Sequence, residues 1–400
     1  MMVPFEFILF GLTLLGVALF HRHTLAVALA GLFVIILYKL AFGDFGGVSG
    51  AAALGRHLMH EWVVVANLFA LLVGFTLLSR HFEESHLPRI LPRYLPDDWK
   101  GGLVLLILVF VLSAFLDNIA AAIIGATVAA SVFRGRVHIG YLAAIVAAAN
   151  AGGAGSVIGD TTTTMMWLDG VAAIDVLHAY VASIAAFAVF AVVAARQQHR
   201  FAPIEKTAGA EVRIDRSRLI IVVLILAGAI AANVYANSLP DRRGEALPYI
   251  GATVLGILLL LAPWRQPDWS AAPAAAKGAV FLLSLVVAAS MMPVEHLPPA
   301  APLTTFWLGL VSAVFDNIPL TKLALEQGGY DWGALAYAVG FGGSMIWFGS
   351  SAGVAVSNLF PEAKSVGQWL REGWHVAVGY VVGFVAFMAI MGWHPHAPHR

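Results

Sequence analysis

Three aspartates stand out because each interrupts an otherwise apolar stretch of the chain. Asp117 and Asp316 lie in two closely similar segments, SAFLDNI and SAVFDNI, and each is followed by an asparagine. Asp160 follows the glycine-rich run NAGGAGSVIG. A carboxylate in an apolar environment is strongly disfavoured unless a proton or a positive charge compensates it, so each aspartate is a candidate functional residue.

The neighbouring residues supply oxygen ligands, which a small hard cation prefers. Carboxylates, amides, hydroxyls and backbone carbonyls freed by helix breaks together suit sodium or lithium. The predicted cation- and proton-binding residues are Asp117, Asn118, Asn150, Asp160, Thr161, Thr162, Asp316, Asn317, Ser344, Ser350 and Ser351. Burial disfavours the charged carboxylate and a bound cation restores it, so sodium and protons would compete for one site. The threonines could equally cap the helix that follows them.

The composition predicts that these residues lie in a membrane. Hydrophobic residues make up 60% of the 400-residue chain, charged residues make up 12%, and the mean hydropathy is +0.84. Lys+Arg and Asp+Glu balance at 23 each, so no net charge points to nucleic acid. The chain contains no cysteine, which excludes disulfides, a thiolate nucleophile and thiolate metal centres. We expect no cofactor and no enzymatic activity.

Two kinds of apolar segment occur along the chain. The uninterrupted ones are long enough to cross a bilayer, and the first is expected to be a retained helix, because its positive charges follow the apolar run. They are 5–20, 24–42, 62–79, 175–195, 219–236, 248–263, 276–292 and 373–393. Four others are broken by polar or glycine residues. Segments 102–133 and 303–325 predict re-entrant hairpins with Asp-Asn tips, and 139–168 and 334–359 predict broken transmembrane helices.

The same order of segments occurs twice, which indicates an internal duplication. The glycines of the first broken helix recur in the second with the same spacing. We predict an all-α membrane protein of two inverted repeats, 1–195 and 219–393, joined by a cytoplasmic linker, 196–218, and followed by a His-rich tail, 394–400. About ten full crossings and two hairpins would place both termini outside. Most Lys and Arg residues then lie inside, and the two hairpin tips meet near the midplane.

Several polar residues leave alternatives open. Lys322 could pair with Asp316, stand in for a cation, bind an anionic substrate, or extend to the membrane surface. The anion alternative predicts a sodium- or proton-coupled carrier of a small carboxylate, aided by half-helix N-termini. Glu61 is expected at a membrane edge without a special role, and the tail histidines in a solvated end rather than a metal site. The Gly-Asp pair at Asp160 resembles that of intramembrane aspartyl proteases but lacks their earlier glycine.

The duplicated motifs resemble those of a known transporter family. The segments SAFLDN, NAGGAGSVIGDTTTTMMW, FDNIPLT and GFGGSMIWFGSSAGV are similar to signature segments of NhaD-type sodium/proton antiporters, within the ion transporter superfamily. The resemblance extends from about residue 60 to 393. It implies a dimerising scaffold, a mobile transport part that moves like an elevator, and cation sites where each tip meets a broken helix. It also implies a multi-pass protein of the bacterial inner membrane, in contact with lipid, that carries sodium or lithium and protons.

Overall fold

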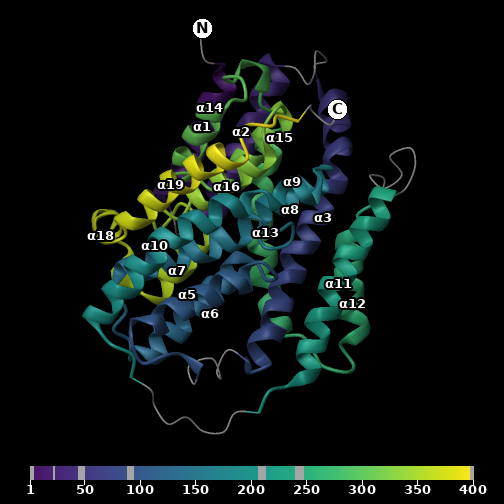
Figure 1. Ribbon diagram of the computed structural model, residues 1–400. Coiled ribbons are helices and arrows are strands. Elements are labelled where there is room, and N and C mark those ends of the chain that lie inside the picture. The colour runs from purple at the N-terminus through teal and green to yellow at the C-terminus, as the bar shows by residue number, and fades with distance from the viewer. Residues whose placement is uncertain are drawn as a thin grey trace.

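All regular structure in the described part of the chain is helical. The computed structural model describes residues 4–20, 23–43, 50–87, 94–205, 213–238 and 247–396, and no strand occurs in these ranges. The helices are apolar over most of their length, and their order agrees with the order of segments expected from the sequence. The chain therefore folds as an all-α protein of membrane type, as predicted (Figure 1).

The described part of the first half contains three apolar helices, two pairs of shorter helices, one short helix and a long final helix. These are α1 (Phe5–Leu19), α2 (Thr24–Phe42), α3 (Ala51–Glu84), α5 (Trp99–Ser113), α6 (Asn118–Val132), α7 (Ile139–Ala154), α8 (Thr161–Leu168), α9 (Ala173–Leu177) and α10 (Ala179–Phe201). The pair α5 and α6 occupies the first predicted hairpin, and α7 and α8 are the two parts of the first predicted broken helix.

The second half repeats this order, and its short helix α18 precedes the final helix as α9 does in the first half. Its helices are α11 (Arg216–Ser238), α12 (Tyr249–Leu261), α13 (Ala272–Ser290), α14 (Pro302–Ser312), α15 (Asn317–Gln327), α16 (Trp332–Gly342), α17 (Ser351–Leu359), α18 (Val366–Glu372) and α19 (Trp374–Ile390). Single turns of 3-10 helix, η3 (Trp269–Ala271), η4 (Val294–His296) and η5 (Pro361–Ala363), lie between them. Helices α14 and α15 occupy the second predicted hairpin, and α16 and α17 the second predicted broken helix.

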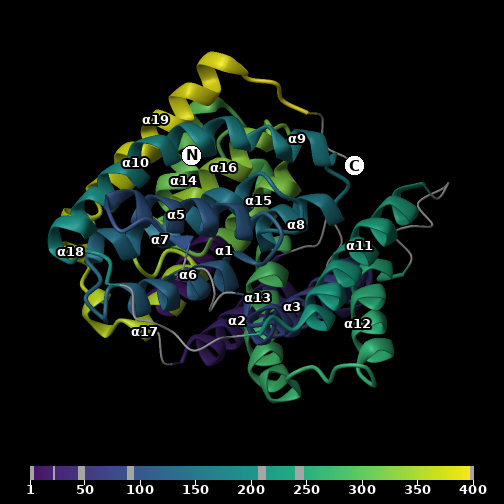
Figure 2. The same ribbon diagram turned by 60° about the horizontal axis from the view of Figure 1, so that its bottom comes forward.

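The helices form two groups. The α3 bundle consists of α1, α2, α3, α11, α12 and α13, and the α7 bundle consists of α5 to α8, α10 and α14 to α19. Figure 2 shows α2, α3, α11, α12 and α13 on one side of the molecule and α5, α7, α10 and α19 on the other. The main contact between the bundles is the packing of α13 on α15, with further contacts of α3 on α8 and on α6.

Within the α7 bundle, the duplicated units interlock crosswise. Helix α6 packs on α17, the second part of the other unit's broken helix, and α15 packs on α8 in the same way. Corresponding pairs also match, because α5 packs on α7 as α14 packs on α16, and the two final helices α10 and α19 lie side by side. Each Asp-Asn turn also lies beside the break of its own unit, as the hydrogen bonds from Asn118 to Asp160 and from Ser351 to Asp316 show.

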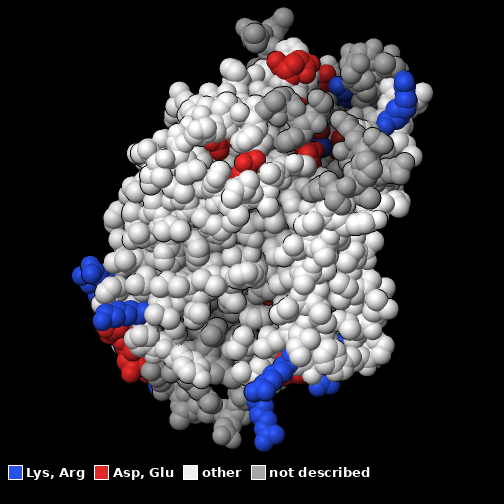
Figure 3. Space-filling view, turned by 45° about the vertical axis from the view of Figure 1, so that its right-hand side comes forward, with Lys and Arg blue, Asp and Glu red and all other residues white. Residues whose placement is uncertain are grey.

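The size and surface of the helices suit a bilayer. Five described helices, or six if the bent pair α18 and α19 is counted as one, are long and apolar enough to cross a membrane, and six further apolar helices are shorter. The 34 residues of α3 span about 51 Å, more than the roughly 30 Å hydrocarbon core, so this helix must extend beyond it. Figure 3 shows charged side chains gathered at two opposite ends, with a broad uncharged band between them.

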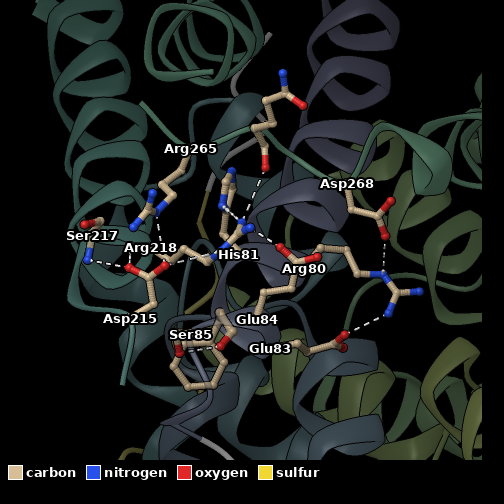
Figure 4. A network of polar contacts seen from close by, with 12 residues as sticks. Arg80, His81, Glu83, Glu84, Ser85, Asp215, Ser217, Arg218, Arg265 and Asp268 are labelled. Atoms are coloured by element: carbon tan, nitrogen blue, oxygen red, sulfur yellow. Dashed lines mark hydrogen bonds and ion pairs between the residues drawn. The ribbon is translucent and has the colours of Figure 1, made fainter. Parts of the chain in front are cut away.

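A charged network holds one end of the α3 bundle together (Figure 4). Arg218, at the start of α11, pairs with Glu84 of α3 at 2.6 Å, and Asp215 accepts a hydrogen bond from Arg265 at 3.1 Å. Asp268 lies 3.8 Å from Arg80, and the hydrogen bond from the Ser270 side chain lowers the pKa of Asp268. These contacts connect α3, α11 and the segment before α13.

The ends of the predicted regions differ in detail from the helices. Helix α10 continues to Phe201 and α11 begins at Arg216, so both enter the region predicted as a linker; 206–212 lies outside the described residues. In the tail, the backbone N–H of His394 donates to Asp331 at 2.9 Å and that of His396 to Tyr330 at 3.1 Å. This described part is therefore attached to the start of α16, while His399 lies outside the described residues.

Candidate cation-binding site

The break between α7 and α8 positions Asp160. Residues 155–160 leave the helix, and Asp160 caps α8, accepting a hydrogen bond from the backbone N–H of Thr162 at 3.0 Å. Glycine is required here, because a Cβ added to Gly153 would lie 2.6 Å from the carbonyl oxygen of Gly159. The same contact occurs in the second break, where a Cβ at Gly343 would lie 2.7 Å from the Gly349 oxygen. These close approaches explain the recurring glycine spacing.

Asp117 lies in the turn between α5 and α6. It caps α6 by accepting a hydrogen bond from the backbone N–H of Ile119 at 3.2 Å. Ser156 joins this turn to the first break, since its hydroxyl donates to the carbonyl oxygen of Ala114 at 2.7 Å. A helix N-terminus stabilises an anionic side chain through its free N–H groups and its dipole, so this carboxylate is held where negative charge is tolerated.

Asp117 and Asp160 face the same cavity. This cavity has a volume of about 170 Å³ and lies between α3, α13, the Asp117 turn and the first break. Thr161, Thr164 and Thr76 add hydroxyl groups to its lining, and the wall formed by α3 and α13 is largely apolar. A water molecule needs roughly 10 to 15 Å³ of such volume, so the cavity has room for a small cation with several waters. Two carboxylates in an otherwise apolar cavity are suited to bind protons or a small cation.

A hydrogen-bonded chain extends from Asp160 to the second break. The Asn118 amide donates to both Asp160 Oδ2 and Asn150 Oδ1, each at 3.1 Å. The amide of Asn150 in turn donates to the hydroxyls of Ser344 at 2.9 Å and Ser350 at 3.2 Å. All five residues are nearly inaccessible to solvent. The structure thus brings residues of both duplicated units into one polar network. Its most distant members in the sequence, Asn118 and Ser350, are 232 positions apart.

The second turn has a simpler environment. Asp316 caps α15, accepting from the backbone N–H of Ile318 at 3.0 Å, and the Ser351 hydroxyl lies 3.4 Å from its other oxygen. Asn317 is buried beside it. Ser350 caps α17, with a hydrogen bond from the N–H of Gly353 at 3.3 Å. The second break therefore has the Ser350 cap where the first has Asp160. Asp316 is thus the one carboxylate that the described turn and break of the second unit contribute.

The four threonines that follow Asp160 differ in what their side chains contact. Thr161 lines the cavity, and Thr162 is buried with its backbone N–H bound to Asp160. The hydroxyls of Thr163 and Thr164 donate back to the carbonyl oxygen of Asp160, each at 2.9 Å. The last two therefore stabilise the break, in agreement with the capping alternative.

Lys322 lies away from Asp316 and within reach of two glutamates. Its ammonium is 2.8 Å from Glu61 Oε2 on α3 and 2.7 Å from Glu326 Oε1 one turn along α15. The Lys322 side chain is only 4% exposed, so the expectation that it could extend to the membrane surface is wrong. With two carboxylates bound, this ammonium is poorly placed to hold an anionic substrate.

Glu61 is the functional candidate that reasoning from the sequence missed. It was expected at a membrane edge, yet α3 begins at Ala51, which places Glu61 well inside the helix, where it is 5% exposed. A buried lysine requires a counter-charge, and Glu326 could have been found from its spacing of four residues. Glu61 could not, because it is 261 residues from Lys322 in the sequence.

Among curated proteins, two plant transporters are similar to this chain. Sodium/proton antiporter 1 of Arabidopsis thaliana is 26% identical over 338 residues, which cover 75% of this chain and 56% of that protein. Sodium/proton antiporter 2 of the same plant is 24% identical over 320 residues, or 70% of this chain and 74% of that protein. The chain thus spans little more than half of the first relative. No family model matches. The distant similarity supports a sodium/proton antiporter type of family, whose members are transporters rather than enzymes.

Proposed function

We propose that this protein is a secondary transporter that exchanges sodium or lithium for protons at Asp117 and Asp160. The observation that carries the proposal is that both carboxylates face one small cavity whose wall is otherwise largely apolar. In such surroundings a carboxylate is stable when it binds a proton or a cation, and the two compete. The names of the distant plant relatives agree with this choice of ions.

The surrounding residues fit this exchange. The Asn118 amide donates one hydrogen bond to the Asp160 carboxylate and a second one to the Asn150 side chain. The acidic group therefore keeps its position whether or not it carries a proton. Thr161 and the backbone of the break add neutral oxygen ligands. We assign the second turn, with Asp316, Asn317 and Ser351, to a further cation site, and Ser344 and Ser350 to the connection between the two.

We further propose that the two halves are inverted repeats and that the transport movement is elevator-like. The matched helix caps and the crosswise packing of α6 on α17 and α15 on α8 support the repeats. In this proposal the α3 bundle is the stationary part and forms a homodimer, and the α7 bundle moves past α3 and α13, which form one wall of the cavity. Both termini lie outside a bacterial inner membrane.

The test is a transport assay with the purified full-length protein in proteoliposomes. The interior of the vesicles is made acidic, and sodium, lithium, potassium or choline chloride is added outside while a pH-sensitive dye reports proton efflux. We expect sodium or lithium, and neither potassium nor choline, to drive proton exchange. Absence of cation-dependent proton movement at every pH from about 6 to 9 would refute the proposal.

A matched pair of variants locates the exchange site. Asp160→Asn removes the acidic group from the cavity but retains the helix cap and should abolish exchange. Asp175→Asn changes an aspartate outside the cavity, 3.6 Å from His396, and should leave exchange unchanged. Loss of exchange in both variants, or in neither, would contradict the assignment to Asp160.

A further inference from the structure

The cluster of Glu61, Lys322 and Glu326 is buried, charged and separate from the aspartate cavity. The three side chains are 6%, 4% and 8% exposed. None of them lines the cavity that contains Asp117 and Asp160. Removing such charges from water is unfavourable, and their mutual attraction offsets this only with good geometry. Distances of 2.8 and 2.7 Å satisfy that condition, but the arrangement still requires an explanation in functional terms.

The first of the two duplicated units has no counterpart of this cluster. Aligning Asp117 with Asp316 places Ile123 and Thr127 of α6 opposite Lys322 and Glu326 of α15. Thus only one of the two corresponding helices carries charged residues at these positions. The duplicated cation-binding turns therefore do not need the charges, and a role specific to α15 is indicated.

The two ion pairs of Lys322 differ in what they connect. The pair with Glu326 lies within α15, with a spacing of four residues, and is retained in any rigid movement of that helix. The pair with Glu61 joins α15 to α3, and so joins the α7 bundle to the α3 bundle. A movement of one bundle relative to the other must break the Glu61 pair and keep the Glu326 pair.

Other charged and titratable groups lie close to the cluster. Lys39 of α2 is buried nearby, and His57, one turn before Glu61, is influenced electrostatically by Glu61, Lys322, Lys39 and His60. Ser290 of α13 lies 3.0 Å from the His57 ring. The turn η4, which also packs on α15, carries Glu295 and His296, which pair with each other near the surface. Of these groups, only Lys322 forms an ion pair with Glu61 in the described part of the chain.

Glu61 also borders a second hollow, between α3 and α13. This hollow has a volume of about 430 Å³ and is lined by apolar side chains, and Glu61 is the one titratable residue among those lining it. When the Lys322 ammonium moves away, Glu61 loses the ion pair that neutralises it and still borders this apolar hollow. A carboxylate in that position must bind a proton or leave the apolar surroundings.

We propose that Glu61 is a second proton-binding site of the exchanger, outside the aspartate cavity, and that its protonation releases α15 from α3. In the described conformation the Lys322 ammonium neutralises Glu61. A proton delivered to the Glu61 carboxylate removes its charge, leaves Lys322 balanced by Glu326, and frees the two bundles to move. The inference rests on the proposed antiport, because it assigns a further proton site to the same transport cycle.

Two variants of the same cluster test this proposal in the proteoliposome assay. Glu61→Gln imitates the protonated residue and leaves Lys322 paired with Glu326. The matched control, Glu326→Gln, removes a carboxylate from the same ammonium but keeps the pair between α15 and α3. We expect Glu61→Gln to move the pH of half-maximal sodium-driven exchange toward alkaline pH by about one unit or more. We expect Glu326→Gln to remain within about 0.3 unit of the wild type.

The outcomes separate this inference from the antiport itself. Equal pH profiles for the wild type and both variants, or equal shifts in both variants, overturn the role of Glu61 and leave the antiport standing. No exchange in the wild type refutes the antiport first. If Glu61→Gln does not fold, Glu61→Asp decides: its shorter side chain weakens the Lys322 pair, so protons bind more readily and the profile should move toward alkaline pH. An unchanged profile in Glu61→Asp overturns the proposal.

Discussion

Replacement of Lys322 by methionine is the substitution with the most clearly defined effect on stability. Methionine has a similar length but no charge, so Glu61 and Glu326 would face each other in a buried region without the ammonium that both contact. Removing one partner from a buried ion pair destabilises proteins by about 3 to 5 kcal/mol. For a long chain 1 kcal/mol corresponds to about 2 °C in Tm, so Tm should fall by roughly 6 to 10 °C.

The triple variant Glu61→Gln, Lys322→Met, Glu326→Gln supplies the contrast. It removes all three charges together, and replacing a complete buried ion cluster is often neutral or stabilising by roughly 1 to 4 kcal/mol. Its Tm should therefore lie near or above that of the wild type. The physical reason is that the triple variant loses the attraction between the three charges but also avoids the unfavourable free energy of removing them from water.

Thermal unfolding in detergent measures both effects. The chain has 11 tryptophans and no cysteine, so intrinsic fluorescence is suitable and thiol-reactive dyes are not. A Tm for Lys322→Met equal to that of the wild type would refute the reasoning, because it would mean that the two glutamates do not depend on the ammonium. A triple variant less stable than Lys322→Met would refute it equally.

Three further predictions concern the site and its supports. Gly153→Ala should lower the Tm measured by thermal unfolding by several degrees, because its Cβ would lie 2.6 Å from a carbonyl oxygen. Gly256→Ala is the control and should leave Tm unchanged, because, apart from its own helix backbone, nothing in the described part of the chain lies within 4 Å of its Cβ position. Asn150→Ala should destabilise the fold by about 1 to 3 kcal/mol and weaken sodium dependence in the transport assay, because the Asn118 and serine groups lose a buried partner. The lowered pKa of Asp268 means that its stabilising contribution is present above the ordinary aspartate pKa and is lost as pH falls through the lowered value. Asp268→Asn should therefore reduce the loss of Tm between about pH 5 and 3, and an unchanged loss would contradict this.

The two turns are not equivalent, although the motif is duplicated. Aligning the recurring glycines places Gly340 and Ser350 where the first unit has Asn150 and Asp160. Asp160 Oδ2 lies 3.6 Å from the position of a Cβ at Gly340, so the small residue of the second unit leaves room for the carboxylate of the first. The asymmetry concentrates negative charge at the first break.

The sequence by itself determined the helical class and the positions of the breaks. The long apolar runs, the Asp-Asn pairs and the glycine spacing are local features, and they predicted α5 to α8 and α14 to α17 to within a few residues at most ends. The three aspartates were also recognisable, because a carboxylate within an apolar segment requires compensation. That each of them caps a helix was seen only in the structure. The inversion of the repeats and the number of crossings remain predictions.

Only the tertiary structure decided which distant residues meet. The hydrogen-bonded chain from Asp160 through Asn118 and Asn150 to Ser344 depends on how α7 packs on α16 and α17 of the other unit, which no local pattern specifies. The pairing of Lys322 with Glu61 likewise depends on how α15 lies against α3, and an isolated glutamate in an apolar helix gives no indication of its partner. Local free energies fix helices and caps, whereas long-range contacts follow from how the helices pack against one another.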